Sequence, residues 1–576
     1  MKRIGLTLIF LSLWFQLQAK KTPVIFEINN RLGRGINMGN AFEPPTETAW
    51  NNPWQPEYFK IMADLGFSHV RIPIRWSTPE RSMEEPPNTI NESFMNRVKQ
   101  VVDTALKYQL HPIINMHHHE DLFLNPTGGK ERFLAQWSQI ADFFKDYPDS
   151  LVFEVLNEPH NNLIPELWND FFAEALEVIR VTNPSRAVLL GTALFGGLSG
   201  VPYLEIPNDP YIILSVHYYN PFQFTHQGAG WVEADSDEWL GTRWLDTKEE
   251  RQTIKDEFSF TLEFAEDNNI PVHVGEFGAY YKADIDSRAR WTTFLARWFE
   301  EQKFSWAYWG FSAGFGIYNP NNGQFNAPLV DALFHNAMPD PAQVWYIPVY
   351  EEVFDLGTGG WQLNVFESAQ VSMMVNDGEL NIDISDAGSE AWHIQLSNQG
   401  IAIKKDNLYR ISFEAFAENQ PRQISSYVGK STAPWTAYSG YIPLNIDDQE
   451  NSYIYSFFMN NLEDNNARLV FDLGLSDTNL TFSKIRVEKL SLVPVNIANT
   501  NYSIKYYPNP VSYQLTIENA NQFQMVSIKN IKGEVIYNCI SQNRQNTINT
   551  SHLAPGVYIL TLGNQSELVT SKFVKK

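Results

Sequence analysis

Apolar runs of strand length alternate with amphipathic segments of helical length between Arg31 and His335. Eight of the runs have the size of buried strands: Gly33–Met38, His69–Ile74, Pro112–Met116, Leu151–Leu156, Ala187–Gly191, Ile212–His217, Val272–Glu276 and Ser305–Trp309. A helical period is clearest between them at Ser93–Tyr108, Lys130–Asp146, Pro165–Thr182, Glu249–Asn268 and Ser287–Gln302, and weakest near Tyr58–Leu65 and after Gly191. This alternation favours a closed (β/α)₈ barrel over an open sheet.

The pattern changes near Met338-Pro339-Asp340-Pro341. From Tyr350 to Val493 the helical period is absent, and alternating runs are separated by Asn, Asp, Gly and Ser clusters. These runs predict an antiparallel β-sandwich; they are Leu380–Ile384, Trp392–Leu396, Leu408–Phe416, Tyr453–Met459 and Arg468–Leu473. A polar stretch, Asn496–Ser503, then precedes a small strand-rich block that runs to Lys576.

The first residues have the pattern of a secretory signal peptide. A basic start, Met1-Lys2-Arg3, is followed by the apolar run Ile4–Leu17 and a small-residue exit at Ala19. The run is too short for a membrane span, and we find no other apolar stretch long enough to be one. We therefore expect an exported protein with a signal peptide (1–19), a barrel (20–338), a linker (339–349), a sandwich (350–495), a second linker (496–503) and a C-terminal domain (504–576).

Composition narrows the possible partners. The formal net charge of -23 gives no electrostatic reason to bind nucleic acid or an anionic membrane. A single cysteine, Cys539, rules out an internal disulfide framework, so packing alone must hold the exported chain together. Aromatic residues make up 14% of the chain, which weakly favours a carbohydrate partner because sugar rings stack on flat aromatic faces.

Two glutamates end strand-like runs in different local settings. Leu151–Leu156 leads into Asn157-Glu158-Pro159, and Val272-His273-Val274-Gly275 leads into Glu276. Barrels of this type carry their chemistry at the carboxyl ends of the strands. Hydrolysis of a sugar–sugar bond needs two carboxyl groups, one that holds a proton for the leaving oxygen and one that is ionised. Both glutamates fall where such a pair belongs.

Other strand ends supply residues that suit this chemistry. Arg71 and Tyr219 can stabilise an ionised carboxylate. Asn157 can donate to a sugar 2-hydroxyl, a bond that strengthens in the transition state. Trp309 has the flat face on which a sugar ring can lie.

These residues and their order resemble glycoside hydrolase family 5, over about Arg31 to Asn336. The motifs that carry the resemblance are Leu156-Asn157-Glu158-Pro159, Gly275-Glu276-Phe277, Gly35–Ala41 and His217–Phe222. It looks closest to bacterial endoglucanases that also accept mannan. The resemblance implies that Glu158 is the acid/base and Glu276 the nucleophile of a retaining mechanism, with Arg71, His117, Asn157, His217 and Tyr219 completing the catalytic group. It also implies substrate contacts from Asn40, Glu43, His118, His226, Trp231 and Trp309, and no metal or organic cofactor.

Retention predicts that the Glu158 and Glu276 carboxyls lie about 5–5.5 Å apart, whereas about 9 Å would favour inversion. Two other functions stay open. The chain would be a catalytically inactive surface protein that binds glycan if the barrel were only a platform. It would be a metal-dependent hydrolase if His117-His118-His119 held an ion, although adjacent strand residues point to opposite sides and need a turn to converge.

The last two domains carry resemblances of their own. The sandwich, with Gly357–Trp361 and Glu390–Leu396, resembles a carbohydrate-binding module of the family 4/9 jelly-roll type, in which Trp361, Trp392, Trp435 and Tyr438 either stack on glycan or fill the core. The final block, with Tyr506–Pro510, Leu553–Leu560 and Phe573–Lys576, resembles the C-terminal sorting domain of type IX secretion. The expected partners are therefore a β-linked polysaccharide (glucan, glucomannan or mannan) and the type IX secretion machinery.

Overall fold

The computed structural model describes residues 23–232, 236–492, 505–518, 523, 525–530, 535–540, 545–563 and 568–576. The predicted signal peptide and the predicted linker 496–503 lie outside these ranges. The chain divides into two compact units. One holds the chain up to Tyr219 with Asp256–Gly278 and Leu295–His335, and the other holds Asn220–Lys255, Ala279–Phe294 and Asn336–Lys576.

Eight parallel strands form a closed barrel in chain order, and the last pairs with the first. The strands are β1 (Arg34–Asn37), β2 (His69–Ile72), β3 (His111–Asn115), β4 (Val152–Glu154), β5 (Val188–Gly191), β6 (Ile212–His217), β7 (Val272–Phe277) and β8 (Ser305–Tyr308). All eight predicted strands are confirmed. The strands are near-continuous apolar runs because helices cover the outer face of a parallel barrel and side chains fill its interior.

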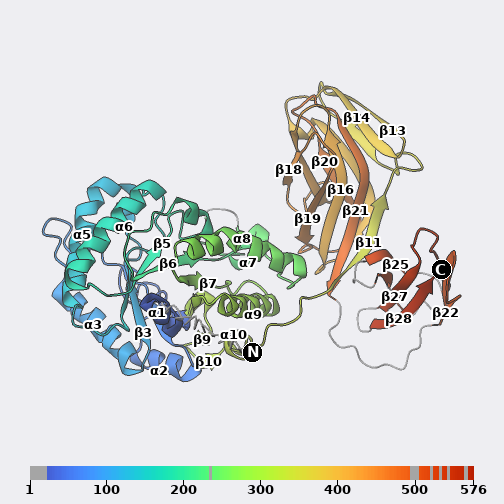
Figure 1. Cartoon of the computed structure of the whole chain (residues 1–576). Coiled ribbons are helices and arrows are strands. Elements are labelled where there is room, and N and C mark those ends of the chain that lie inside the picture. The colour runs from blue at the N-terminus through green and yellow to red at the C-terminus, as the bar shows by residue number, and fades with distance from the viewer. Residues whose placement is uncertain are drawn as a thin grey trace, which may run out of the picture. The chain divides into compact units, whose positions relative to one another are not determined.

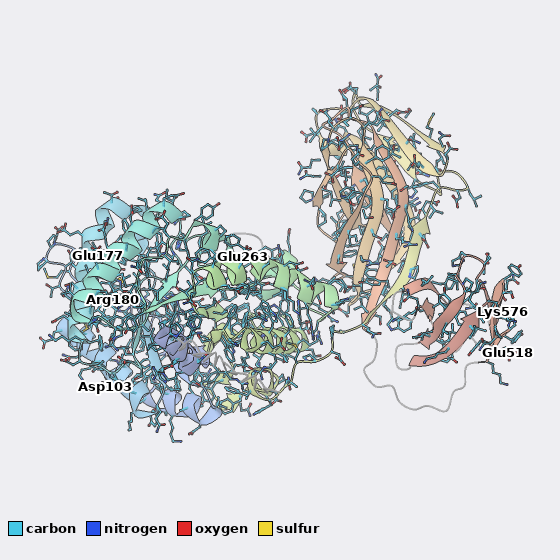
Figure 2. The ribbon with its side chains drawn as sticks, viewed as in Figure 1. Asp103, Glu177, Arg180, Glu263, Glu518 and Lys576 are labelled. Carbon is cyan, nitrogen blue, oxygen red and sulfur yellow. The ribbon has the colours of Figure 1, made fainter. Side chains whose placement is uncertain are left out.

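Helices follow the strands along the chain, and Figure 1 shows α2, α3, α5 and α6 outside the barrel strands. The helices of the alternation are α2 (Pro56–Leu65), α3 (Glu92–Lys107), α5 (Pro126–Phe143), α6 (Pro165–Thr182), α8 (Lys248–Asp267) and α9 (Ile285–Glu301). Two begin at an asparagine cap, since the side chains of Asn91 and Asn125 accept from the backbone N–H of Ser93 and Gly128. Charged residues such as Asp103 on α3 and Glu177 on α6 lie on these helices (Figure 2).

The segment between β5 and β6 forms only a 3₁₀-helix, η1 (Leu198–Tyr203), where the sequence pattern was weak. Pro202 and nearby glycines disfavour a full α-helix there. The pattern also missed α1 (Val24–Leu32), whose Ile25, Ile28 and Leu32 pack with apolar residues of β3 to β6. Short elements complete this part: α4 (Glu120–Leu124), α7 (Phe222–Thr225), η2 (Ser236–Trp239), η3 (Ala313–Phe315), β9 (Tyr318–Asn319), β10 (Gln324–Phe325) and α10 (Ala327–Phe334).

Two antiparallel sheets form the predicted sandwich. One has the order β13-β14-β21-β16-β19, with β11 also paired to β21, and the other has the order β12-β15-β20-β17-β18. The strands are β11 (Val344–Glu352), β12 (Gln362–Val365), β13 (Gln370–Asn376), β14 (Glu379–Asp386), β15 (Ile394–Ile403), β16 (Leu408–Ala417), β17 (Arg422–Gly429), β18 (Ile442–Ile446), β19 (Asn451–Phe458), β20 (Asp464–Asp472) and β21 (Leu480–Leu492), with a 3₁₀ turn η4 (Ala391–His393). A shared apolar core, which includes Ile411 and Phe471, fills the space between the sheets.

The C-terminal domain has two smaller sheets, β22-β23-β26 and β25-β24-β27-β28, around its own apolar core. The strands are β22 (Tyr506–Tyr507), β23 (Gln514–Glu518), β24 (Met525–Lys529), β25 (Val535–Ile540), β26 (Gln545–Asn549), β27 (Gly556–Gly563) and β28 (Leu568–Lys575). Among the described helices of the whole chain, none is long and apolar enough to cross a membrane.

Candidate active site

The carboxyl ends of β4, β6 and β7 bring Glu158, His217 and Glu276 together. One ligand atom from each side chain lies within 4.8 Å of those of the other two. His217 Nδ1 lies 2.7 Å from Glu158 Oε1 and 3.7 Å from Glu276 Oε2. Burial lowers the pKa of His217, but the two carboxylates beside it outweigh that effect and raise it above its ordinary value. The imidazole therefore lies close to both glutamates and is hydrogen-bonded to Glu158.

Glu276 is buried, and both of its oxygens accept hydrogen bonds. Arg71 Nη1 donates to Oε1 at 2.7 Å and the Tyr219 hydroxyl donates to Oε2 at 2.9 Å. Burial, followed by the charge of Glu276, raises the pKa of Tyr219 well above its ordinary value, so the phenol keeps its proton and stays a donor. These bonds stabilise the negative charge that an attacking carboxylate carries.

The backbone turns Glu276 towards these partners through a register shift. β6 and β7 pair regularly up to Val216 and Val274, and the next pair is His217 with Glu276. The extra residue, Gly275, would place a Cβ only 3.0 Å from the His217 ring if it carried one. A bulge at a glycine therefore brings the histidine and the glutamate side by side at the strand ends.

Arg71 is fully buried and holds a second carboxylate that the sequence analysis did not single out. Its Nε and Nη2 donate to Glu154 at 2.5 and 2.7 Å, while Nη1 also donates to Asn37 at 2.9 Å and Nη2 to Asn157 at 2.7 Å. Burial opposes the charge, but Glu154 and Glu276 raise the pKa of Arg71 above its ordinary value. The sequence could have indicated that Glu154 is paired, because a glutamate inside an otherwise apolar buried strand needs a charged partner.

Glu158 differs from Glu276 in exposure and backbone conformation. Its side chain is 27% exposed, against 6% for Glu276, so solvent reaches it more easily. Its φ of 46° is left-handed, which is uncommon for a residue with a side chain and costs on the order of 1 kcal/mol or more. His160 Nδ1 bonds the Glu158 carbonyl at 2.5 Å and holds this turn.

Gly196 supports Glu158 from the loop after β5. Its φ is 70°, and a Cβ there would lie 3.0 Å from His217 Nδ1 and 3.1 Å from Glu158 Cγ. The Gly196 carbonyl also accepts from the His217 backbone N–H at 2.8 Å. Only a residue without a side chain fits this conformation and this approach.

His117 is held in one tautomer by the side chain of Asn115. The Asn115 Oδ1 accepts from the Ile74 N–H at 3.1 Å, which fixes the amide so that its Nδ2 donates to His117 Nδ1 at 3.1 Å. Burial lowers the pKa of His117 well below its ordinary value, so the neutral ring carries its proton on Nε2 as a donor. The His117 ring lies parallel to Trp309 with the centroids 6.0 Å apart, and edge-on to His118 at 4.6 Å.

Asn40 and Glu43 lie together after β1. The Asn40 backbone N–H donates to Glu43 Oε1 at 2.6 Å, and Glu43 Oε2 is buried with no hydrogen-bond partner among the described residues. Burial raises the pKa of Glu43 to about 8. The hydrogen bond from the Asn40 N–H lowers this pKa, and the charge of Glu276 raises it. Glu43 therefore keeps its proton at neutral pH and lies close enough to Glu276 for the two carboxyl groups to interact.

The other two predicted substrate contacts belong to the second compact unit. His226 follows α7, stacks on Phe222 with the centroids 4.1 Å apart, and has its pKa lowered to about 4 by burial. Trp231 is 58% exposed and contacts Tyr280 edge-on at 4.8 Å. Their proposed contact with substrate stays a prediction.

The run His117-His118-His119 does not gather around one point. His119 is buried near Arg132 and Gln136, away from the His117–Trp309 stack. Within the described ranges, the one set of histidine, cysteine and acidic side chains close enough to share a metal ion is Glu158, His217 and Glu276.

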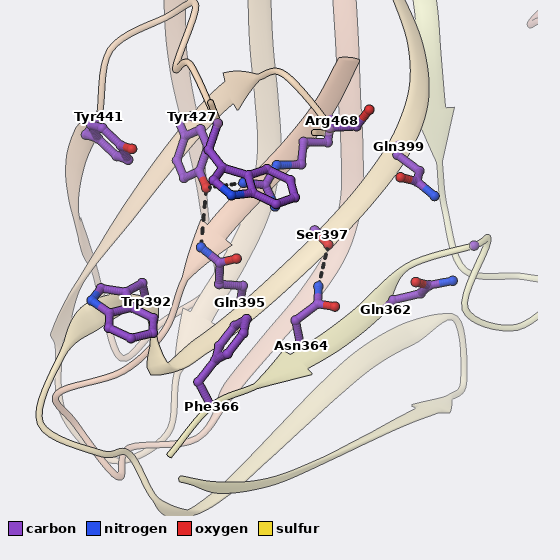
Figure 3. A pocket seen from close by; sticks show the side chains of 13 residues that line it. Gln362, Asn364, Phe366, Trp392, Gln395, Ser397, Gln399, Tyr427, Tyr441 and Arg468 are labelled. Atoms are coloured by element: carbon purple, nitrogen blue, oxygen red, sulfur yellow. Dashed lines mark hydrogen bonds between the residues drawn. The ribbon is translucent and has the colours of Figure 1, made fainter. Parts of the chain in front are cut away.

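The sandwich has a pocket of about 450 Å³ on the β12-β15-β20-β17-β18 sheet (Figure 3). Aromatic side chains line it together with amides: Phe366, Trp392, Tyr427, Trp435, Tyr441, Gln362, Asn364, Gln395 and Gln399, with Ser397, Ser431, Gly360 and Arg468. Trp392 and Trp435 are 45% and 52% exposed. Of the four aromatics singled out from the sequence, these two line the pocket, whereas Trp361 is buried in the core and Tyr438 packs against it.

Comparisons with known protein families match three regions of the chain. Residues 35–314 match the cellulase model of glycosyl hydrolase family 5, residues 348–479 match a carbohydrate binding domain, and residues 505–576 match a secretion system C-terminal sorting domain.

Two curated relatives match about half of the chain. Endoglucanase H of Acetivibrio thermocellus is 36% identical over 317 residues, which are 54% of this chain and 33% of that one. Endoglucanase A of Clostridium longisporum is 32% identical over 326 residues, 50% of this chain and 60% of its own. The chain thus spans between a third and three fifths of the length of these two relatives.

A solved structure matches a similar share of the chain. Thermotoga maritima Cel5A in complex with mannotriose is 47% identical, with a TM-score of 0.53, and the match covers 54% of this chain and all of that one. The closed barrel and the motifs at its strand ends agree with these matches. The chain belongs, through its barrel, to glycosyl hydrolase family 5.

Proposed function

We propose that the chain is an endo-acting hydrolase of β-1,4-linked glucan that works with retention of configuration. The observation that carries the proposal is the placement of Glu158 and Glu276, whose nearest oxygens lie within 4.8 Å with His217 between them. A retaining pair stands about 5–5.5 Å apart, whereas an inverting pair leaves room for a water at about 6.5–9.5 Å.

In the first step a Glu276 oxygen attacks the anomeric carbon. The bond from that carbon to the bridging oxygen breaks, and the proton of Glu158 passes to the leaving oxygen. Glu276 suits attack because Arg71 and Tyr219 fix its orientation. Glu158 is assigned the proton transfer because its partly exposed side chain can meet the leaving oxygen and, in the second step, water.

In the second step water replaces the protein on the sugar. Glu158, now ionised, takes a proton from water, the new oxygen bonds to the anomeric carbon, and the bond to Glu276 breaks. Both carboxyl groups then return to their starting states. Asn157, whose Oδ1 accepts from Arg71, would donate from its Nδ2 to the sugar 2-hydroxyl, and the Nε2 proton of His117 would be a further donor.

The substrate class follows from the neutral and aromatic character of the surroundings. Trp309 and His117 offer a flat, uncharged surface to a pyranose ring. The relatives are named endoglucanases, and solved structures of Thermotoga maritima Cel5A hold cellobiose or mannotriose. We therefore expect cleavage of cellulose-type glucan, with mannan or glucomannan as a second substrate.

The sandwich pocket is proposed to hold a glycan chain. Exposed indole rings beside several amides suit sugar faces and hydroxyls, respectively. Trp392→Ala and Trp435→Ala should each weaken retention on an insoluble glucan without changing hydrolysis of a soluble oligosaccharide. Equal retention of both variants and the parent chain would remove the pocket from the proposal.

We propose export through the type IX machinery, with the segment 1–19 as signal peptide and the domain from residue 504 onward as the sorting signal. The match of residues 505–576 supports the second signal. Deleting that domain in a host with this machinery should leave the enzyme inside the cell. Unchanged activity in the medium would contradict the assignment.

Release of reducing ends from carboxymethyl cellulose, lichenan and mannan, measured side by side, tests the hydrolase. Glu276→Ala should lose at least about three orders of magnitude in kcat, the scale on which a nucleophile is missed, while still binding polysaccharide. Unchanged turnover by the variant would end the assignment. An inactive parent chain would favour a glycan-binding protein, and loss of activity in EDTA would favour a metal-dependent hydrolase.

A further inference from the structure

The loop between β1 and α2 exposes one large aromatic ring, that of Trp50. It is 43% exposed, whereas the other tryptophan of the loop, Trp54, is 2% exposed. An isolated exposed tryptophan is ordinary on a protein surface. Two features set Trp50 apart: the loop is tied down on both sides of it, and the ring continues a row of rings that begins at the active site.

Hydrogen bonds and packing fix the loop between β1 and α2. Before Trp50, the Glu47 carboxylate accepts two hydrogen bonds of 2.8 Å from Arg97 on α3. After it, Asn52 donates to the Gly39 carbonyl at 2.9 Å and accepts from Ser312 at 2.8 Å. Trp54 then packs on Phe42 and Phe59, with the centroids 6.2 and 5.4 Å apart. The position of Trp50 is therefore set before any ligand arrives, which lowers the entropic cost of binding.

The row of rings leads from Trp309 through His117 and His118 to Trp50. Trp309 and His117 are parallel, His117 and His118 meet at 88°, and Trp50 meets His118 at 75° with the centroids 5.8 Å apart. The angle of 75° means that the His118 ring does not lie flat over the Trp50 indole. Burial lowers the pKa of His118, so the row offers a neutral surface.

The two ends of the site differ in which loops build them. Glu158, the proposed donor of a proton to the leaving sugar, is supported by His160 and Gly196 from the loops after β4 and β5. Trp50 comes from the loop after β1 and reaches the loop after β3. The row thus runs from Trp309 to the loops after β1 and β3, whereas the proposed proton donor to the leaving sugar is held by the loops after β4 and β5.

We propose that Trp50 is a platform for a distal, neutral pyranose on the non-reducing side of the cleaved bond, which makes it a determinant of chain-length preference. The proposal rests on the glucan hydrolysis proposed above. The apolar face of a β-1,4-linked sugar would stack on the indole, and the fixed loop would hold the ring in place for it.

Aryl β-cello-oligosaccharides of two to four glucose units test this, since the aryl leaving group is constant and added sugars extend only to the non-reducing side. Trp50→Ala should lower kcat/KM on the longest by about tenfold, the scale of one aromatic contact, through KM, and leave the aryl cellobioside unchanged. Trp50→Phe should retain most of the activity on the long substrate.

Phe143→Ala is the matched control, because Phe143 is a 37% exposed ring at the end of α5, just before the amino end of β4. It should match the parent chain on every substrate. Equal losses of Trp50→Ala on short and long substrates, or no loss on either, would overturn the platform. A parent chain that hydrolyses none of the substrates would instead refute the proposed function.

Discussion

Replacing Glu154 with glutamine tests whether the buried Arg71 network positions the active site. Glu154 is 1% exposed and accepts two bonds from Arg71, at 2.5 and 2.7 Å. A glutamine side chain has the same shape as glutamate but only one acceptor oxygen. Its NH₂ group would therefore face one of the two Arg71 N–H donors, which would lose its hydrogen bond. A hydrogen bond to a charged group contributes about 1.5–3 kcal/mol, and an unmatched buried donor adds to the loss.

We therefore expect Glu154→Gln to cost about 2–4 kcal/mol in the unfolding free energy of the barrel. A domain of this size loses roughly 2 °C of Tm per kcal/mol, so its melting transition should fall by roughly 4–8 °C in calorimetry. The kcat should fall as well, because Arg71 also holds Glu276 and Asn157. Product length should stay the same, since Arg71 is buried beneath the groups assigned to substrate contact.

Glu47→Gln is the matched control, because Glu47 pairs with Arg97 through two bonds of 2.8 Å but both side chains are about 30% exposed. Exposed pairs contribute about 0.2–1 kcal/mol, so its Tm should move by about 2 °C or less. If Glu154→Gln melted and turned over like the parent chain, or like Glu47→Gln, the claim that Arg71 organises the site through Glu154 would be refuted.

Three further variants test the buried acid Glu43, the close approach of Gly196 and the buried Arg422 of the sandwich. Folded Glu43, with a pKa of about 8, holds a proton that the unfolded chain has released above pH 4.5, so the parent chain loses stability as the pH rises from 5 to 8. Glu43→Gln has no such group and should gain stability relative to the parent over this range. Parallel Tm–pH curves of the two chains would contradict this. Gly196→Ala should lower kcat by about tenfold or more. The φ of 70° disfavours alanine, and the added Cβ would lie 3.0–3.1 Å from His217 and Glu158 and force these two side chains to move. An unchanged kcat would refute that contact. Arg422→Met removes a buried guanidinium that donates to four carbonyls, of Leu473, Gly474, Ser476 and Thr478; the sandwich should lose about 3 kcal/mol and roughly 6–12 °C of Tm, and a soluble substrate should be cleaved as before.

The sequence predicted the barrel because its signals are local. Each strand is a short apolar run, and α6 begins and ends where its pattern does, at Pro165 and Thr182. Glu158 and Glu276 could be predicted to lie together because strand ends converge in a barrel, and the structure brings them within 4.8 Å. The segment after Gly191 failed to form an α-helix, and α1 was overlooked because one short amphipathic segment has no partner visible in sequence.

What the sequence could not predict depends on three-dimensional neighbours. Glu154 lies four residues before Glu158 in the same run, yet only the fold reveals that it shares Arg71 with Glu276. The left-handed backbone at Asn40, His118 and Glu158 depends on loop packing. The division of the sandwich aromatics into core and pocket likewise required the sheet pairing, since Trp361 and Trp392 look alike in an alternating pattern.

Trapping of the covalent intermediate would show whether Glu276 forms a bond to the sugar. A cellobioside with fluorine at carbon 2 and a good leaving group at carbon 1 slows both chemical steps, the second more than the first, so a retaining enzyme accumulates its glycosyl form. We expect one added fluorocellobiosyl group in the intact mass, located on Glu276 by peptide mass spectrometry and absent from Glu276→Gln. A label on another residue, or rapid turnover to the inverted sugar without any label, would contradict this.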